Sequence, residues 1–396
     1  MDLLIIKKNG EKQIALTNEE TLVEFYIEET IDTRNEGNIF IGTVKNILEG
    51  MESAFVDIGT EKNSYIHFKD LLPKEDETKK DVSKSEKTKK IKDVIKENDK
   101  ILVQVKKDSN DLKGARISTH ISLPSKYIVL MPNTDIVTVS QKIEDEKEQQ
   151  RLIKLVKENL SPNNGAVIRT SAENKTEEII NDIKNIEAVW EKIENDYKKE
   201  KTSEPKLIYK CEDIAQKMLI DLTDKKISRV ISNNDKELEK VRQFIKDSSE
   251  YANIKLKTMP LKDIEQVYDL ENQIEKIKRR KIWLKCGGYI TIDKTEALTA
   301  IDVNTGKCTD GNSLADIIYK VNEQATIEIA KQLRLRDIGG IIIIDYIDML
   351  RDGDKEKIEK VLKECLKEDR TKTQVEGFTK LDLMELTRKH ICSHKN

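Results

Sequence analysis

Two apolar runs decide the fold and the candidate site of this chain: Ala300-Ile-Asp-Val-Asn-Thr-Gly-Lys307 and, further along, Gly339-Gly-Ile-Ile-Ile-Ile-Asp-Tyr-Ile-Asp348. Each run of β-prone residues breaks at an aspartate, Asp302 in the first and Asp345 in the second. Short apolar runs bounded by glycine predict buried strands. A carboxylate where such a strand emerges lies at the rim of a sheet, where α/β folds place their chemistry. With Asn304 beside the first aspartate, the pair predicts a site for a hard divalent cation such as Mg²⁺.

Two other interpretations of these residues stay open at this point. Asp302 and Asp345 also suit ordinary Asx turns at strand ends, with no role in binding. The segment Asn304-Thr-Gly-Lys307 is similar to the tail of a phosphate-binding loop, but the glycine expected earlier in that loop would fall at Ile301, so the pattern fails. Lys307 either faces a phosphate or points into solvent.

A helix is predicted between the two runs. Ser313 suits its N-cap, and one face of the segment that follows is apolar at helical spacing. The residues on that face are Leu314, Ile317, Ile318, Val321, Ala325 and Ile329. Because a strand–helix–strand order is typical of an α/β layer, we expect both aspartates to emerge on the same edge of one sheet.

The composition narrows the chemistry that this chain can carry out. Its 396 residues, of which 37% are charged and 5% aromatic, carry a net charge of −3 and suffice for about two to four domains. The five cysteines are scattered without a CxxC spacing, which predicts reduced thiols in a cytoplasmic protein. The N-terminus is too weakly apolar for a signal peptide, and no run reaches transmembrane length. Because no HExxH pattern occurs either, we expect oxygen ligands for any metal.

Short strands dominate the first part of the chain. A meander is predicted over residues 1–35, and four further strands at roughly ten-residue spacing predict a small barrel. These four are 38–44, 53–58, 63–68 and 100–105. The highly charged segment 74–100 interrupts the barrel, and its few apolar residues predict a solvated, partly disordered loop. A nucleic-acid tether is the alternative, which the interspersed acids disfavour.

The barrel strands carry aromatic side chains. Phe55, Tyr65, His67 and Phe68 lie on them, and exposed rings there would stack with unpaired bases. The alternative is that Phe55 and Phe68 belong to the barrel core.

Basic clusters flank the aspartate strands. They are Lys276-Ile-Lys-Arg-Arg-Lys281 and Arg334-Leu-Arg336, placed as a groove for a phosphate backbone requires. A charge run is more often a solvated surface. Elsewhere, residues 120–205 predict an α+β unit with helices near 143–159 and 176–199, and residues 206–278 alternate helical and strand patterns.

Seven segments spread over nearly the whole chain form one collinear and specific set. They are Gly42-Thr-Val44, Ala54-Phe-Val-Asp-Ile-Gly59, Leu123 to Pro132, Val167-Ile-Arg-Thr170, Glu296-Ala-Leu-Thr-Ala-Ile-Asp-Val-Asn304, Ala330-Lys-Gln-Leu-Arg-Leu-Arg-Asp-Ile-Gly-Gly340 and Ile344-Asp-Tyr-Ile-Asp-Met349. Together they closely resemble the ribonuclease E/G family.

The resemblance implies a multidomain protein of α/β and β parts. An RNase H-like fold would be split by an inserted OB-fold barrel and by a 5′-end-sensing α+β region, and a DNase I-like α/β catalytic domain would follow. The implied domains are 1–35 with 206–278, 36–119 with the charged insertion 74–100, 120–205, and 279–396, in that order.

The resemblance also implies an activity, namely a Mg²⁺-dependent endoribonuclease that cuts single-stranded RNA and leaves a 5′-phosphate and a 3′-hydroxyl. Asp302 and Asp345 would hold the catalytic Mg²⁺, and Asn304 would contact the scissile phosphate. A non-catalytic OB-fold RNA-binding protein is the main alternative, and a phosphatase or nucleotide hydrolase is a weaker one.

Further site residues are implied by matching positions. Phe55 and Tyr65 would contact bases on the barrel, and Lys113 would contact the substrate. Arg169 and Thr170 match the pocket for a 5′-monophosphate, because a guanidinium and a hydroxyl suit a terminal phosphate.

The sequence departs from the family at its C-terminus. The family commonly joins subunits through a shared zinc ion at a CPxC motif, and Lys389-His-Ile-Cys-Ser-His-Lys-Asn396 lacks that motif. We therefore predict neither bound zinc nor a zinc-linked dimer, and a homo-oligomer would have to form through a different interface. Cys392 and His394 are the only candidates for remnant zinc ligands. No long C-terminal scaffold follows, which predicts the compact, ribonuclease G-like form.

Overall fold

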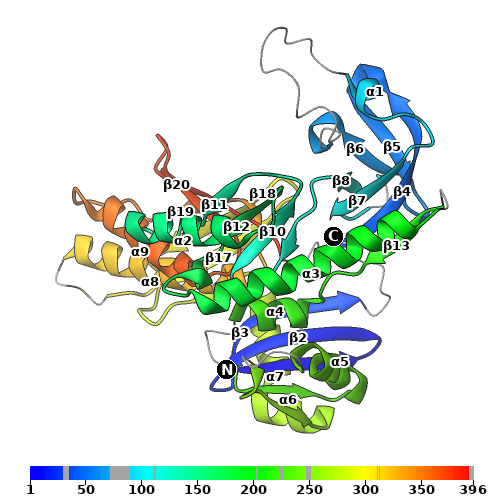
Figure 1. Cartoon of the computed structure of the whole chain (residues 1–396). Helices are drawn as coiled ribbons and strands as arrows, with labels where there is room; N and C mark the ends of the chain where they lie inside the picture. Colours follow the sequence, from blue (N-terminus) through cyan, green and yellow to red (C-terminus); the bar gives the residue numbers. More distant parts are fainter. Residues whose placement is uncertain are drawn as a thin grey trace. The chain divides into compact units, whose positions relative to one another are not determined.

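The computed structural model (Figure 1) describes residues 1–29, 35–71, 90–109, 113–201, 204–222, 227–246, 251–309, 311 and 313–391. The chain divides into two compact units. The first combines Met1–Ile31 with Ile214–His394, and the second is Asp32–Asp213, so the second is inserted in the sequence of the first. The finer division into four domains stays a prediction. Within the described ranges, no helix is both long and apolar enough to span a membrane.

The first unit begins with a five-stranded sheet. Its strands are β1 (Asp2–Lys8), β2 (Glu11–Asn18), β3 (Thr21–Glu29), β14 (Arg229–Ser232) and β15 (Lys255–Thr258), in the order β15-β14-β1-β2-β3. β1 pairs in parallel with β14 and antiparallel with β2. The predicted meander is therefore confirmed, and β1 is the central strand.

Helices cover both faces of this sheet. They are α4 (Ile214–Leu222), α5 (Asp235–Ile245), α6 (Leu261–Tyr268) and α7 (Leu270–Lys278). Leu3 and Ile5 of β1 pack with α4 and α5, whereas Leu4 and Ile6 pack on the other face with α6 and α7. This two-sided burial explains the unbroken apolar run Leu3-Leu-Ile-Ile6, because a strand covered on both faces has no polar alternation.

A six-stranded sheet completes the first unit. Its strands are β16 (Lys281–Trp283), β17 (Tyr289–Lys294), β18 (Leu298–Asn304), β19 (Gly340–Asp345), β20 (Thr373–Phe378) and β21 (Leu383–Arg388), in the order β16-β17-β18-β19-β21-β20. β18 and β19 are parallel neighbours joined through α8 (Leu314–Leu335), as predicted. The Ser313 hydroxyl caps α8 by accepting from the Asp316 N–H. Leu314, however, was wrongly assigned to the apolar face, since it is 63% exposed.

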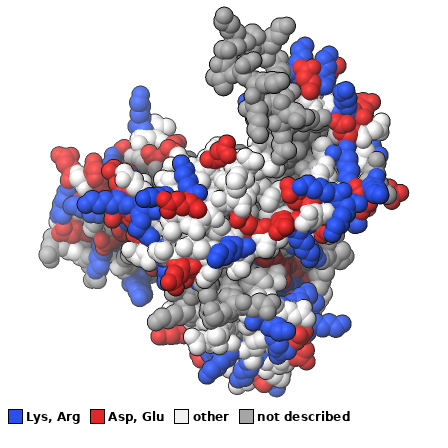
Figure 2. Space-filling view, in the orientation of Figure 1, with Lys and Arg blue, Asp and Glu red and all other residues white. Residues whose placement is uncertain are grey.

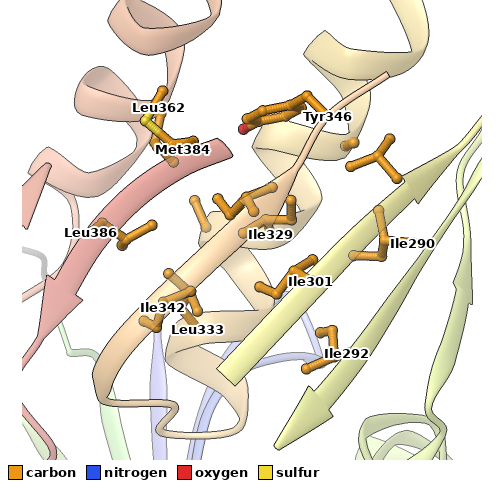
Figure 3. Close-up of a cluster of buried hydrophobic side chains, with 14 of the residues drawn as sticks. Ile290, Ile292, Ile301, Ile329, Leu333, Ile342, Tyr346, Leu362, Met384 and Leu386 are labelled. Atoms are coloured by element: carbon orange, nitrogen blue, oxygen red, sulfur yellow. The ribbon is translucent and has the colours of Figure 1, made fainter. Parts of the chain in front are cut away.

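The core of this sheet lies on one face only. Figure 3 shows inward side chains of β17, β18, β19 and β21 packed against Ile329 and Leu333 of α8 and against Leu362 of α9 (Asp354–Lys367). Residues alternate along β18, with Ile301 and Val303 buried and Ala300 and Asp302 exposed. The opposite face of the sheet therefore carries the polar residues of these strands.

The second unit contains the predicted barrel. It consists of β4 (Ile39–Leu48), β5 (Ser53–Asp57), β6 (Ser64–His67), β7 (Lys100–Lys107) and β8 (Arg116–Ser118). The ring closes because β4 pairs with both β5 and β7, and β8 pairs with both β6 and β7. β13 (Lys206–Tyr209) adds to β4 outside the ring.

Part of the predicted charged loop 74–100 is structured, which corrects that prediction. Residues 72–89 lie outside the described residues, but a helical turn, α1 (Ile91–Val94), follows. Ile91 and Ile95 are 0% and 2% exposed and belong to the barrel core. Two apolar residues inside a charged segment thus help to hold its end against the barrel, together with the hydrogen bond from the Ile91 N–H to Glu52 and the ion pair of Lys92 with Glu49.

The rest of the second unit is the predicted α+β region. A sheet of β9 (Leu123–Pro124), β10 (Ile128–Pro132), β11 (Val137–Val139) and β12 (Asn164–Ile168) packs with α2 (Glu146–Asn159) and α3 (Glu177–Lys199). The long helix α3 buries Ile179, Ile183, Ile186, Trp190 and Ile193, a stripe at helical spacing.

Candidate active site

The two aspartates of the sequence prediction lie side by side. β18 and β19 pair in parallel with Asp302 opposite Asp345, and both residues are exposed on the face away from the helices. One expectation about Asp302 was wrong: β18 does not end there but continues to Asn304. Asp302 therefore projects from the sheet face, whereas Asp345 is the last residue of β19.

Asn304 lies on the same face as Asp302, two residues further along the strand. Its side-chain amide Nδ2 donates a hydrogen bond of 2.5 Å to Oδ2 of Asp302. This bond fixes the orientation of the carboxylate and leaves the other carboxylate oxygen for a ligand.

The site concentrates negative charge. Partial burial and the neighbouring charges of Asp302 and Asp348 together raise the pKa of Asp345 above its ordinary value. Asp348 was quoted in the sequence run but not proposed as a site residue. Asp348 follows the end of β19 by three residues, and nothing in the local sequence Asp345-Tyr-Ile-Asp348 distinguishes it from an ordinary loop aspartate.

Helix α8 holds the chain just beyond Asp345. The Asn322 side chain donates to the Ile347 carbonyl at 2.8 Å and accepts from the Ile347 N–H at 3.1 Å. One turn on, the Thr326 hydroxyl lies 2.8 Å from the Tyr346 hydroxyl. Asn322 and Thr326 are both fully buried. The sequence interpretation missed this clamp, although two polar residues four apart beside an apolar helix stripe were a usable signal.

The loop after Asn304 is tightly constrained. Gly306 has φ +55°, and a Cβ there would lie 2.4 Å from the Gly287 carbonyl oxygen, so the position requires glycine. The Lys307 N–H donates to the same carbonyl at 3.0 Å. The Lys307 side chain is exposed, so phosphate contact and plain solvation both stay open for it.

Some residues of the basic clusters around the site are paired with acids. Arg280 binds both carboxylate oxygens of Asp293 at 2.5 and 2.6 Å, and Arg334 lies 3.5 Å from Glu368. Figure 2 shows Lys and Arg interspersed with Asp and Glu over the visible surface. Arg280 and Arg334 are therefore partly neutralised, and the groove for a phosphate backbone stays a prediction.

Phe55 and Tyr65 lie next to each other on the outer face of the barrel. They are directly opposite in the β5–β6 pair, with ring centroids 6.3 Å apart in an edge-to-face arrangement. Both are half-buried, while their strand neighbours Ala54, Val56 and Ile66 fill the core. The alternative that Phe55 is a core residue is thus wrong, whereas Phe68 does pack against the core.

Lys113 lies in the connection between β7 and β8 and is exposed. The adjacent Gly114 approaches the start of β6 so closely that a Cβ would lie 2.0 Å from the Asn63 carbonyl oxygen. The Tyr65 N–H donates to the Ala115 carbonyl at 2.7 Å. The loop that carries Lys113 is therefore fixed beside the strand that carries Tyr65.

Arg169 and Thr170 follow β12 directly. The Arg169 guanidinium donates to the Ser125 carbonyl at 2.7 Å, and the Thr170 hydroxyl lies 3.2 Å from the Ser140 hydroxyl. Asp182 of α3 binds the same segment, since it accepts from the Ser125 hydroxyl and from the Tyr127 N–H. Asp182 was missed by the sequence interpretation, because its position on an amphipathic helix looks like any solvated acid.

No group of three or more His, Cys, Asp and Glu side chains suited to a metal is found among the described residues. The candidate zinc remnants Cys392 and His394 lie outside those residues. The oxygen donors that the structure brings together are thus Asp302 and Asp345, with Asn304 beside them.

Known proteins align with nearly the whole chain. The Ribonuclease E/G family profile matches residues 122–391. Ribonuclease G of Salmonella typhimurium is 37% identical over 393 residues, which cover 98% of this chain and 79% of that protein. Ribonuclease G of Haemophilus influenzae is 36% identical over 394 residues, with the same coverage. Ribonuclease E of Nostoc sp. is 32% identical over 391 residues, covering 96% of this chain and 56% of that protein.

The chain therefore belongs to the ribonuclease E/G family. It is an endoribonuclease of that family, and the alternative of a non-catalytic RNA-binding protein falls away.

Proposed function

We propose that this endoribonuclease hydrolyses single-stranded RNA in a Mg²⁺-dependent reaction, in RNA processing or turnover in the cytoplasm. The products would be 5′-phosphate and 3′-hydroxyl ends. The observation that carries the proposal is the pairing of Asp302 with Asp345 on the open face of the six-stranded sheet.

The donor set fits Mg²⁺. This ion takes oxygen ligands, usually one or two carboxylates completed by water and substrate phosphate. Burial and the charges of Asp302 and Asp348 raise the pKa of Asp345, and a divalent cation between Asp302 and Asp345 would offset the repulsion between these two carboxylates. Asp302 and Asp345 would hold the ion, which when bound polarises a phosphodiester and lowers the pKa of a ligated water.

The remaining residues of the site position these groups. Asn304 orients Asp302 and, by its place on the same face, is suited to contact the scissile phosphate. Asn322 holds the chain that leaves Asp345, so the carboxylate is presented from a fixed backbone. Such preorganisation matters because misplaced groups lose catalytic power steeply.

The barrel offers a surface for the single strand. Phe55 and Tyr65 form a partly exposed aromatic pair, on which unpaired bases would stack. Lys113, held on a loop beside Tyr65, would supply a positive charge for the phosphate backbone.

The end of β12 offers a pocket for the 5′ end of the substrate. Arg169 and Thr170 would bind a 5′-monophosphate through a guanidinium and a hydroxyl. Arg169 and Asp182 both hold the segment around Ser125, which supports a prebuilt site. We accordingly propose a preference for 5′-monophosphorylated RNA.

The domain assignment belongs to this proposal. The order β15-β14-β1-β2-β3, with a central β1 parallel to β14, supports an RNase H-like sheet. The closed barrel supports the OB-fold assignment, and the mixed sheet with α8 and α9 on one face supports a DNase I-like catalytic domain.

A substitution of similar size tests the catalytic assignment. Asp302→Asn removes the charge and should reduce cleavage at least ~100-fold, with binding of single-stranded RNA retained. Asp293→Asn is a matched control, because Asp293 lies two strand positions away on the same sheet face but is bound to Arg280. Cleavage should stop in EDTA and return with excess Mg²⁺. Undiminished cleavage by the Asp302 variant would contradict the assignment.

The 5′-end preference has its own test. Arg169→Gln should lower kcat/KM for 5′-monophosphorylated RNA towards the value for 5′-hydroxyl RNA. The rate on 5′-hydroxyl RNA should stay unchanged, because that substrate has no terminal phosphate. An equal loss on both substrates would show a structural role for Arg169 instead.

A further inference from the structure

An aromatic pair lies beside the catalytic carboxylates on the same sheet face. Trp283 of β16 is directly opposite Tyr289 of β17, and Tyr289 is directly opposite Asn304 of β18. Directly opposed residues of antiparallel strands project from the same face. Trp283, Tyr289 and Asn304 therefore form one row across the sheet, next to the row that contains Asp302 and Asp345.

The two rings are packed together, with Tyr289 partly buried and Trp283 exposed. Their centroids are 5.2 Å apart at an interplanar angle of 62°, and Trp283 is 58% exposed. Tryptophan is on average one of the more buried residue types, and Trp190 of the same chain is only 8% exposed. An exposed tryptophan on a rigid strand leaves a large flat apolar surface in solvent next to the candidate active site.

A lysine accompanies the rings. The Lys281 ammonium lies 4.3 Å from the centroid of Trp283 and 3.4 Å from that of Tyr289. Lys281 is opposite Thr291, which is in turn opposite Asp302. Lys281 thus belongs to the same row as Asp302, two strands away, and its ammonium lies over the two rings of the neighbouring row. Rings for a base and a cation for a phosphate are the two elements with which proteins bind single-stranded nucleic acid.

A purely structural role would be protection of an edge strand. β16 is the edge of its sheet, and lysine is a common residue at such edges. That role explains Lys281, but it does not require a half-exposed indole next to the catalytic row. The two roles can be distinguished by experiment. Only a role in base binding makes the effect of a Trp283 substitution on cleavage depend on the presence of a base in the substrate.

We infer that Trp283 and Tyr289 form a stacking subsite for the nucleobase of a nucleotide that flanks the scissile phosphate, with Lys281 beside the backbone of that nucleotide. The inference rests on the proposed cleavage of RNA at Asp302 and Asp345. The subsite recognises the flat face of a base rather than its edge, so purines, with the larger ring system, should bind better than pyrimidines.

The experiment removes the ring and the base separately and together. Short single-stranded RNAs with one cleavage site carry an abasic nucleotide at each flanking position in turn. Trp283→Leu should lower kcat/KM on intact RNA about tenfold, since stacking of one base contributes about 5- to 150-fold. One abasic position should lower the wild-type kcat/KM by a similar factor. The same abasic RNA should then be cut equally by the wild type and by the leucine variant.

Two further variants control for indirect effects. Trp283→Phe keeps an aromatic face and should recover most of the loss. Ile327→Ala removes another half-exposed apolar side chain, 51% exposed on α8, and should leave kcat/KM unchanged.

The outcomes separate the subsite from the proposed function. If the wild type cuts intact RNA but Trp283→Leu cuts it equally well, the subsite is overturned and the catalytic assignment stands. The subsite is also overturned if the abasic substitution costs the wild type and the leucine variant the same factor. If the wild type cuts no RNA in Mg²⁺, or Asp302→Asn cuts as well as the wild type, the proposed function fails.

Discussion

Replacement of Arg388 by methionine should destabilise the sheet that carries the candidate active site. Arg388, the last residue of β21, has a fully buried side chain. It donates to Asp337 at 2.9 Å, to Asp369 at 2.7 Å and to the Ile338 carbonyl at 2.9 Å. Methionine fills a similar volume but leaves both carboxylates, each 1% exposed, without their cation.

The size of the effect follows from the desolvation of two acids. Breaking one buried ion pair by removing a partner costs about 3–5 kcal/mol, and here two acids lose the same partner. We therefore expect a loss near 5 kcal/mol in the free energy of opening of β19 and β21. Neutralising the acids as well, in the triple variant Arg388→Met, Asp337→Asn, Asp369→Asn, should recover part of it, because the amides remove the two buried charges that have lost their cation.

The pH dependence of the loss has a definite sign. In the wild type, bonds and charge from Arg388 hold the pKa of Asp369 below its ordinary value, although burial opposes them. In the methionine variant, burial without a cation should raise the folded-state pKa of Asp369 above its unfolded value. A raised folded pKa stabilises the folded state at low pH and loses that effect as pH rises. The difference in the free energy of opening between the wild type and the methionine variant should therefore become smaller from pH 7 to pH 5.

Hydrogen–deuterium exchange of peptides from β19 and β21 measures this opening without assuming that the whole chain unfolds in one step. The β10–β12 peptides of the second unit serve as an internal control and should not change. The reasoning would be refuted if the variant lost less than about 1 kcal/mol in the free energy of opening. It would also be refuted if this loss became larger towards pH 5.

Three further predictions concern other sites. Lys12 and neighbouring lysines depress the pKa of buried Glu237 from 4.5 to about 2 despite the cost of burial. Glu237→Gln should therefore lower the free energy of unfolding by about 3 kcal/mol at pH 7 and by little near pH 2. Thermal melts at the two pH values measure this difference. Asp182→Asn should loosen the segment that Arg169 binds and reduce the preference for 5′-monophosphorylated RNA about tenfold, with unchanged kcat on 5′-hydroxyl RNA in steady-state assays. Phe55→Leu should raise KM for single-stranded RNA about 5- to 150-fold without a change in kcat, and a fall in kcat alone would speak against a binding role.

Periodicity and turn residues were sufficient to predict most of the architecture. Strands of the barrel and of both sheets of the first unit produce apolar runs with glycine at their ends, and α8 shows both its cap and its stripe. The predictions that were wrong concern single residues. Ile91 and Ile95 lie in a segment dominated by charge, so their burial depends on a barrel core that no local pattern shows. Leu314 fits the helical stripe, but as the first residue of α8 it stays 63% exposed.

The candidate site was predictable to a similar degree. An aspartate in an apolar run is a visible anomaly, and the parallel register of β18 and β19 then places Asp302 against Asp345. The contacts that hold the site were harder to predict. The spacing of Asn322 and Thr326 on α8 was a usable signal, but the contact of Asn322 with Ile347 is set by tertiary register rather than by spacing along the chain. Trp283 is a similar case, because a single strand does not reveal which of its faces stays open.

The insertion of the second unit into the first has a consequence for synthesis of the protein on the ribosome. β1 pairs with β14 through Asp2 and Arg229, so the central strand of its sheet waits for a partner from more than two hundred residues downstream. At about 5–20 residues per second, this delay is roughly 10–45 s. During that time the strand Leu3-Leu-Ile-Ile6 presents an unpaired apolar edge, a known template for aggregation, while the inserted unit is synthesised. A nascent chain halted before residue 229 should therefore show a protease-resistant second unit and an N-terminus that chaperones bind.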